Sequence, residues 1–341
     1  MCRRLFKALW CVVLILATGC STKWVMDADV SETQQLWVQE PRIPKARHVL
    51  TIRGFKETGT SLKSVLFGKR GHPLLRPVAV ATGRDGRIAI VDAEARCVAL
   101  FRASDQSYSP ICGTADIDFV SPVSAIFDEE LRLYVADSAL GRVFVFDAQG
   151  APLTALSTPS GGFARPTGLA YNLDRKMLYV IDTVANKIYA YSPKGELLFS
   201  FGERGTAAGQ FNYPTHLFWS PAGLLYVTDA MNFRIQIFND DGTFRTAFGS
   251  HGDGSGDFAM PKGVAVDRFG TIYVVDSLFD NVQLFTERGN FLLTLGRRGS
   301  GHGEFWLPSG AFIDSDRLYI SDTYNQRVQV FQLYGNPYEQ E

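Results

Sequence analysis

The stretch that decides the fold is Ile272-Tyr273-Val274-Val275-Asp276, an apolar run that ends in an aspartate. The same pattern ends at five other aspartates, which are Asp92, Asp137, Asp182, Asp229 and Asp322. From one aspartate to the next the spacings are 45, 45, 47, 47 and 46 residues. A fixed period of this length is typical of repeat architectures, in which each repeat is one supersecondary unit.

Each repeat contains three more segments with strand character. A proline-led segment starts 10 to 12 residues before each apolar run, a third segment such as 281–285 follows the aspartate, and a fourth such as 244–248 follows a glycine turn. Their β-branched and aromatic residues favour strands. Four short antiparallel strands per repeat predict a blade of a β-propeller, and six repeats predict a closed all-β ring of six blades. Leucine-rich and helical repeats need shorter units or a 3.6-residue period.

The ring needs one strand from the N-terminal region to close. The sixth repeat ends with its third strand at Phe331, whereas an additional fourth-strand pattern lies at 61–68, before the first repeat. We therefore expect residues 61–68 to complete the last blade and tie the two ends of the ring together. Residues 48–55 are expected either to add an edge strand or to pack beneath the blade.

The composition excludes some functions. The chain has 341 residues, 46% of them apolar and 20% charged, which suits a globular protein with a large core. Its 34 basic and 35 acidic side chains give a net charge of -1, which argues against nucleic acid as a partner. With 32 Gly, 25 Phe and only 5 His, the chain suits glycine-rich turns between strands better than a histidine-rich metal enzyme.

The first twenty residues have the features of a secretory signal. Arg3, Arg4 and Lys7 precede a short apolar stretch and then a run of small residues that ends at Cys20. Residues 16–20 (LATGC) resemble the lipobox of bacterial lipoproteins, which implies that Cys20 carries fatty acyl chains such as palmitate and becomes the mature N-terminus. Ser21 after the cysteine implies sorting to the outer membrane. The alternative is ordinary signal cleavage with a cysteine at this place by chance.

These observations predict three segments. Residues 1–19 are the signal peptide, residues 20–47 are a lipidated tether, and residues 48–341 form a single six-bladed propeller that we expect to be monomeric. The expected location is the bacterial cell envelope.

The repeats also carry a family resemblance. Residues 261–285 resemble the NHL repeat, and residues 322–331 (DTYNQRVQVF) are similar to it almost letter by letter. Together with the lipobox, the chain resembles bacterial six-bladed NHL-repeat lipoproteins. That resemblance implies the fold and leaves the activity open.

Two cysteines remain in the repeats. Cys97 is expected on a third strand and Cys112 on the following fourth strand, and the midpoint between them falls at the turn around Asp105. A symmetric hairpin would place the two thiols opposite each other, in a compartment that permits disulfides. We predict a cross-strand disulfide between Cys97 and Cys112.

The loops after the strand-terminal aspartates suggest where a site lies. Five positions after each aspartate, most repeats have a basic residue. These basic residues could form either a ring for an anionic ligand or, as we prefer, a structural ion-pair and turn network. The same loops present an apolar set, which indicates either packing between neighbouring blades or a face for protein recognition: Leu140, Val184, Met231, Phe233, Leu278, Phe279 and Tyr324.

An enzyme is the rival hypothesis. Some propellers that resemble this sequence are metal-dependent lyases or lactonases, with peptidyl-hydroxyglycine amidating lyase the most similar, and such chemistry needs several ligands in the channel. Here only His216 is expected on an innermost strand, while His251 and His302 lie in loops between blades. We therefore expect no cofactor and no catalytic residue, and predict a scaffold that binds an envelope protein or polymer.

Overall fold

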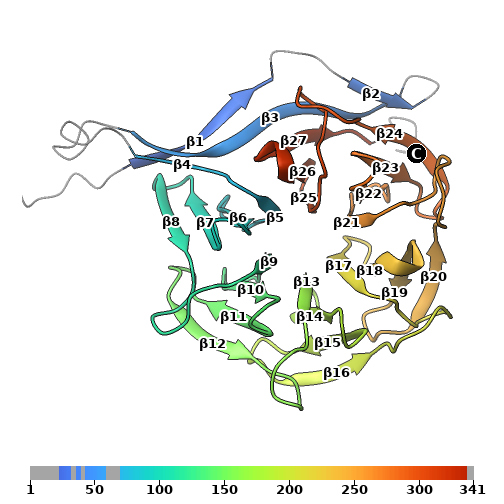
Figure 1. Cartoon of the computed structure of the whole chain (residues 1–341), viewed down its shortest axis with the longest axis horizontal. Coiled ribbons are helices and arrows are strands. Elements are labelled where there is room, and N and C mark those ends of the chain that lie inside the picture. Colours follow the sequence, from blue (N-terminus) through green and yellow to red (C-terminus); the bar gives the residue numbers. More distant parts are fainter. Residues whose placement is uncertain (1–22, 32–35, 40–42, 59–69, 336–341) are drawn as a thin grey trace, which may run out of the picture.

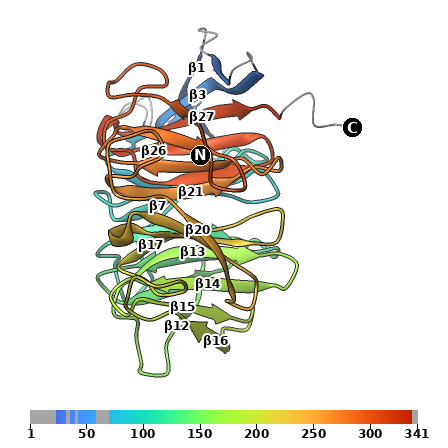
Figure 2. The same ribbon diagram turned by 90° about the vertical axis from the view of Figure 1, so that its right-hand side faces the viewer.

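The computed structural model describes residues 23–31, 36–39, 43–58 and 70–335. In this part of the chain six sheets stand around a central axis, and the strands β5, β9, β13, β17, β21 and β25 lie nearest to it (Figure 1). Figure 2 views the same ring from its side, with β1 and β3 at one rim and β16 at the opposite rim. The all-β propeller predicted from the 45-to-47-residue period is confirmed.

The first five blades are four-stranded antiparallel sheets, and successive strands in the chain are neighbours in each sheet. The first two blades consist of β5 (Pro77–Thr82), β6 (Ile88–Asp92), β7 (Cys97–Arg102) and β8 (Ser107–Ile111), then β9 (Pro122–Phe127), β10 (Leu133–Asp137), β11 (Arg142–Phe146) and β12 (Pro152–Leu156). The third blade consists of β13 (Pro166–Asn172), β14 (Met177–Asp182), β15 (Lys187–Tyr191) and β16 (Leu197–Phe201). The fourth and fifth consist of β17 (Pro214–Trp219), β18 (Leu225–Asp229), β19 (Arg234–Phe238) and β20 (Phe244–Phe248), then β21 (Pro261–Val266), β22 (Ile272–Asp276), β23 (Asn281–Phe285) and β24 (Phe291–Leu295).

The place of each strand in its blade explains its sequence pattern. Four of the second strands, among them β22, are buried at every residue because neighbouring blades pack on both of their faces, so they are continuous apolar runs. The fourth strands lie at the outside of the ring, and in β16 half-buried and exposed residues alternate. This difference accounts for the strong apolar signal of the second strands in the sequence.

The sixth blade closes the ring with a strand from the N-terminal region. β25 (Ala311–Asp314), β26 (Arg317–Asp322) and β27 (Arg327–Leu333) are joined by β3 (Ile43–Thr58), which pairs with β27 from Val328↔Ile52 to Leu333↔Ala46. The expectation that residues 61–68 fill this place is wrong, because residues 46–52 occupy the edge of β27. Residues 61–68 themselves lie outside the described residues.

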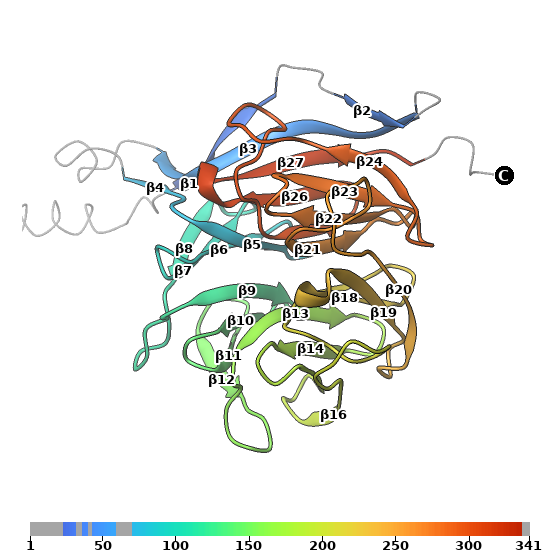
Figure 3. The ribbon, with the colours of Figure 1, turned by 45° about the vertical axis from the view of Figure 1, so that its right-hand side comes forward.

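The described part of the expected tether at 20–47 is also mostly strand. β1 (Lys23–Val30), β2 (Leu36–Gln39) and β4 (Gly71–Pro73) all pair with β3. Figures 1 and 3 show β1 and β4 beside the first blade, where the Trp24 backbone N–H donates to Gln106 O at 2.7 Å. The ring of Trp24 lies 4.9 Å from that of Tyr108 on β8. The described part of this segment therefore belongs to the folded domain and joins the last blade to the first.

The ring has two faces that differ in their loops. Pro77 pairs with Asp92, so the start of the first strand and the end of the second lie at the same edge of the blade. The turns between second and third strands and the connections between blades therefore share one face, which we call the upper face. The lower face carries the turns between first and second strands and between third and fourth strands.

Candidate functional site

The six strand-terminal aspartates organise the upper face. Asp276 shows the arrangement: its carboxylate accepts the backbone N–H groups of Ala259 and Met260 from the preceding connection, and those of Leu278 and Phe279 from its own turn. In all six blades the aspartate accepts an N–H from the connection before its own blade. A carboxylate that binds several backbone donors holds a connection against a turn, so the repeated aspartate is a structural element.

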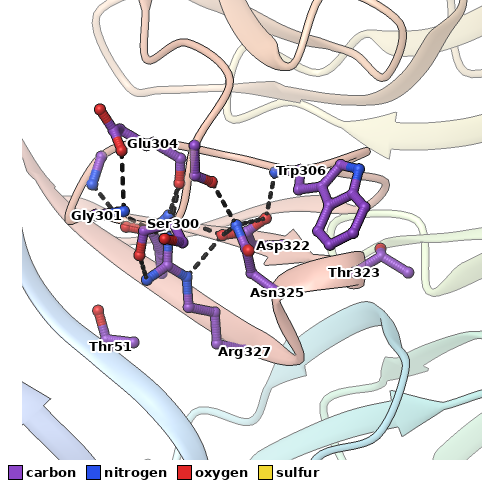
Figure 4. A network of polar contacts seen from close by, with 12 residues as sticks. Thr51, Ser300, Gly301, Glu304, Trp306, Asp322, Thr323, Asn325 and Arg327 are labelled. Atoms are coloured by element: carbon purple, nitrogen blue, oxygen red, sulfur yellow. Dashed lines mark hydrogen bonds and ion pairs between the residues drawn. The ribbon is translucent and has the colours of Figure 1, made fainter.

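The basic residue five positions later completes this network in two blades. Arg327 is buried and donates from Nε to Asp322 Oδ2 at 2.7 Å, and its other nitrogens donate to Ser300 O, Gly301 O and Glu304 O (Figure 4). Arg234 does the same with Asp229 at 2.8 Å. The one-turn helices η1 (Ala230–Asn232) and η2 (Thr323–Asn325) occur in these two blades.

The other four blades lack this ion pair. In the described residues Arg142 and Lys187 form no ion pair with the aspartate of their blade, and Cys97 and Asn281 are not cations. The predicted ion-pair network therefore holds in the fourth and sixth blades, whereas in the other four blades the aspartate accepts backbone N–H groups of its own turn.

The predicted apolar set divides into exposed and half-buried residues. Val184, Met231, Leu278 and Tyr324 are exposed, at 49%, 51%, 58% and 46% of their surface. All four stand two positions after the aspartate, in four consecutive blades. Leu140, Phe233 and Phe279 are half-buried, and Leu140 and Phe233 pack against the core. Packing thus explains those two residues but not the four exposed ones.

The structure adds apolar residues that the sequence analysis missed. Leu75, Val120, Tyr213 and Trp306 are exposed just before the first strands and lie on the same upper face. The ring of Trp306 lies 5.6 Å from that of Tyr324, and the Arg76 guanidinium lies 5.6 Å from the Tyr324 centroid. We call the eight exposed residues the upper rim: Leu75, Val120, Val184, Tyr213, Met231, Leu278, Trp306 and Tyr324. The signal that could have shown the additional four is their fixed place one or two residues before the prolines.

A cavity of about 600 Å³ lies inside the ring. All six innermost strands line it, and so do turns of the lower face such as those at Arg84, Glu129 and Asp314. Most of the lining side chains are apolar, among them Leu169, Leu217, Trp219 and Phe312. The cavity therefore opens on the face opposite to the upper rim, and it has the size and character of a small-molecule site.

Glycines narrow the ring near the upper end of this cavity. Gly168, Gly263 and Gly310 all stand two residues after the proline of their first strand. A Cβ added to Gly168 would lie 2.8 Å from Thr215 O, and one added to Gly310 would lie 2.5 Å from Val78 O. Neighbouring innermost strands approach each other so closely here that no side chain fits.

His216 occupies the equivalent position in the fourth blade, and its imidazole lies at this narrow end. Its half-buried side chain lines the cavity, and Nδ1 lies 3.2 Å from Thr215 Oγ1. Desolvation, and then the nearby Lys262 ammonium, lower the pKa of His216 to about 3. Desolvation and the Arg165 guanidinium in turn lower the pKa of Lys262. The imidazole is therefore neutral at pH 7, with the Lys262 ammonium as the cation near it.

The three histidines considered as metal ligands are not brought together. The ring of His251 is tilted against that of Phe233 with 4.3 Å between their centroids, and His302 stacks against His48 at 4.7 Å. Within residues 23–31, 36–39, 43–58 and 70–335 no group of three or more His, Cys, Asp or Glu side chains could hold a metal ion. His216 thus has no second histidine beside it.

The two cysteines of the first blade form a disulfide. β7 pairs with β8 from Val98↔Ile111 to Arg102↔Ser107, and continuing this register by one residue places Cys97 opposite Cys112. The bridge links the third and fourth strands where they leave the sheet on the upper face. Cys20 lies outside the described residues.

Comparisons with known proteins agree with the fold. A family model described as a 6-bladed beta-propeller matches residues 210–278 and 269–341. No curated protein matches the chain in sequence. In the described part of the chain no helix is both long and apolar enough to cross a membrane.

Solved structures with the same fold have varied functions. A catalytically inactive virginiamycin B lyase from Staphylococcus aureus with quinupristin has a TM-score of 0.61 at 11% identity, over 92% of this chain and 100% of the lyase. A gluconolactonase from Xanthomonas campestris has a TM-score of 0.58 at 18% identity, over 76% and 87% of the two chains. An auxiliary nutrient binding protein from Bacteroides thetaiotaomicron has a TM-score of 0.59 at 14% identity, over 76% and 69%. At these identities the likeness shows the fold alone.

Proposed function

We propose that this protein is a lipid-anchored scaffold of the bacterial cell envelope whose upper face binds another protein. The observation that carries the proposal is the upper rim. Eight exposed apolar side chains, three of them aromatic, stand at equivalent positions around one face. Aromatic residues and methionine are enriched in protein interfaces. In the turns of the lower face, within the described part of the chain, Leu173 is the one large apolar residue that is exposed.

The N-terminal strands support a particular orientation on the membrane. Only Ser21 and Thr22 separate Cys20 from Lys23, where β1 begins. Three residue steps span at most about 10 Å, so an acylated Cys20 would keep the edge of the sixth blade close to the lipid surface. Val30, Leu36 and Val38 are exposed on β1 and β2 at this same edge. The ring would then stand on its edge, with both faces accessible.

The membrane part of the proposal has a direct test. We expect a Cys20→Ser variant to lose acylation and to leave the membrane fraction, while the wild-type chain stays with it until detergent is added. Mass spectrometry of the mature N-terminus reports the acyl chains. An unacylated wild-type chain that is cleaved elsewhere would contradict the lipid anchor.

The binding part is tested by crosslinking in intact cells followed by affinity capture. We expect the Met231→Asp, Leu278→Asp double variant to lose a crosslinked protein that the wild type captures. Leu198→Asp is the matched control, since Leu198 is 49% exposed on β16 at the outside of the ring. Equal capture by both variants, or no specific protein with the wild type, would contradict binding at the upper rim.

A metal-dependent lyase or lactonase is the second candidate, and the central cavity with His216 is the observation that favours it. Stoichiometric metal in the purified protein, lost in His216→Ala, would support the enzyme over the scaffold. For the scaffold we expect His216→Ala to leave the crosslinked protein unchanged.

A further inference from the structure

Two of the repeated basic residues on the upper face have no counterion. Arg142 and Lys187 stand five positions after the aspartate in the second and third blades, and neither side chain forms an ion pair or a hydrogen bond among the residues that the structure describes. Arg142 is exposed and Lys187 is half-buried. Their aspartates have other donors, because Asp137 accepts four backbone N–H groups and Asp182 accepts three. Both cations are therefore available to a partner.

The fold brings a third free cation to the same place. Arg165 is exposed at the end of the connection between these two blades, and its carbonyl accepts the N–H of Thr183, in the turn before Lys187, at 3.0 Å. The backbone N–H of Phe163, in the same connection, donates at 2.9 Å to the carbonyl of the residue before Arg142. In the described part of the chain the Arg165 guanidinium has no ion pair either. We call Arg142, Arg165 and Lys187 the basic patch.

The basic patch occupies a part of the upper face that has no acidic residue in its loops. Three segments form it, and none of them contains Asp or Glu: 138–142, 157–165 and 183–187. The connections on either side do carry exposed acidic residues, Asp118 and Glu203, so the uncompensated positive charge is confined to this sector. Val120 and Val184 of the upper rim, 46% and 49% exposed, lie in the same two blades. Positive charge thus stands beside apolar surface.

We propose that the basic patch binds an acidic segment of the partner protein, one that carries both carboxylates and apolar side chains. This inference rests on the proposed function, because it names the kind of protein that the upper rim would bind. Arg and Lys form charge-assisted hydrogen bonds with carboxylates, and complementary charges across an interface select the partner and speed its association. Val120 and Val184 suit the apolar side chains of the same segment.

Two other anionic partners fit these observations less well. The second and third blades lie across the ring from β1 and β3 (Figure 1), so a lipid anchor at the N-terminal edge would hold the basic patch away from the membrane surface. An anionic polysaccharide supplies charge but no apolar side chains for the two valines. An acidic protein segment satisfies both the cations and the apolar surface.

The test uses two fluorescein-labelled peptides that differ only in charge, Glu-Leu-Glu-Val-Glu-Leu-Glu and the same peptide with Gln in place of Glu. Fluorescence polarisation with the purified full-length mature protein gives both affinities at low ionic strength, where exposed charges are screened least. We expect the Glu peptide to bind about tenfold more tightly, which corresponds to about 1.4 kcal/mol over three exposed charge pairs. The preference should shrink as salt is added.

Substitutions in the basic patch should remove the preference. We expect the Arg142→Gln, Arg165→Gln, Lys187→Gln triple variant to bind the two peptides equally, and to lose the crosslinked protein that the wild type captures in intact cells. The Arg142→Lys, Arg165→Lys, Lys187→Arg variant keeps all three charges and should keep both properties. This second variant separates loss of charge from a change in folding.

The matched control removes three positive charges from the opposite face. Arg84, Lys194 and Arg288 are exposed in turns of the lower face, and their triple replacement by Gln should keep the preference for the Glu peptide. Equal affinity of the wild type for the two peptides, no binding of either, an equal loss in this control, or capture of the crosslinked protein by the triple variant of the basic patch would each overturn the proposal.

Two further outcomes separate the alternatives. Tighter binding of polygalacturonate, which has carboxylates and no apolar side chains, than of the Glu peptide would indicate an anionic polymer and overturn the acidic protein segment. Failure of the proposed function is distinct from both, because it shows as equal capture of the crosslinked protein by the Met231→Asp, Leu278→Asp variant and the Leu198→Asp control, whatever the affinities of the peptides.

Discussion

Arg327 offers the sharpest test of what holds the ring together. Its side chain is 1% exposed and Asp322 is 0% exposed, so the pair lies wholly inside the protein. Replacement by methionine keeps the volume roughly constant but removes all four hydrogen bonds of the guanidinium. Three carbonyl groups of the connection at residues 300–304 and one buried carboxylate then lose the donor that the guanidinium supplied.

We expect Arg327→Met to lower the free energy of unfolding by about 3–5 kcal/mol at pH 7, which is typical of breaking a buried ion pair from one side. Asp322 keeps the N–H of Trp306 and the side-chain amides of Asn325 and Gln329, which favours the lower part of this range. The assay is urea unfolding followed by tryptophan fluorescence and circular dichroism. Arg142→Met is the matched control, because Arg142 is exposed at the same position of the second blade and should change stability by less than about 0.5 kcal/mol.

The pH dependence gives an independent check. Burial already raises the pKa of Asp322 in the folded protein, and loss of the arginine removes an interaction that lowers it. A carboxyl whose folded pKa exceeds its unfolded pKa binds a proton more readily in the folded state. The stability difference between wild type and Arg327→Met should therefore shrink as the pH falls toward 4. A loss below about 1 kcal/mol, or equal losses in the two arginine variants, would refute the reasoning.

Three further predictions follow from the described contacts. The Cys97→Ala, Cys112→Ala double variant should be about 3 kcal/mol less stable than the oxidised wild type, because the bridge closes a loop with a sequence separation of 15. An intact mass without reductant that shows two free thiols in the wild type would contradict the bridge. Burial and the nearby His302 and Arg327 lower the pKa of His48 from its usual 6.5 to about 4. The stability that neutral His48 contributes is therefore complete above pH 6.5, and it falls by about 1.4 kcal/mol per pH unit from there to about pH 4. In His48→Gln the free energy of unfolding, measured with urea at a series of pH values, should change less over this range. The same pH dependence in the variant and the wild type would contradict this prediction. Gly310→Ala should lower the free energy of unfolding by about 1–3 kcal/mol, because the added Cβ would meet Val78 O. Gly71→Ala should leave it almost unchanged, because a Cβ there meets nothing within 4 Å. Thermal melts of the two variants would show whether they differ.

The sequence indicates the fold well because the signals that define a blade are local. Each second strand is packed on both faces and is therefore a largely apolar run, and in four blades the aspartate that ends it binds the backbone of its own turn. Six copies at 45 to 47 residues predict a ring before any long-range contact is known. The Cys97 and Cys112 prediction depends on a register that one hairpin sets by itself.

The closing strand is less local. Residues 61–68 and residues 43–58 both contain strand patterns, and a period-2 pattern does not say which strand edge it will pair with. The edge of β27 is filled by β3, which also carries β1, β2 and β4. The strand pattern at 61–68 therefore predicted the wrong segment for the closing strand, and the segment expected to be a tether contains the first folded strands.

The amino-acid sequence by itself determined the number of repeats, the turn chemistry at the aspartates and the loop positions of the exposed apolar residues. Only the tertiary structure decided which of those residues stay exposed, because exposure depends on the neighbouring blade. The same is true of the cavity, because the residues that line it come from all six innermost strands. His216 looks unremarkable within its own repeat, and it lines a cavity only because the closed ring gathers its first strands around one axis.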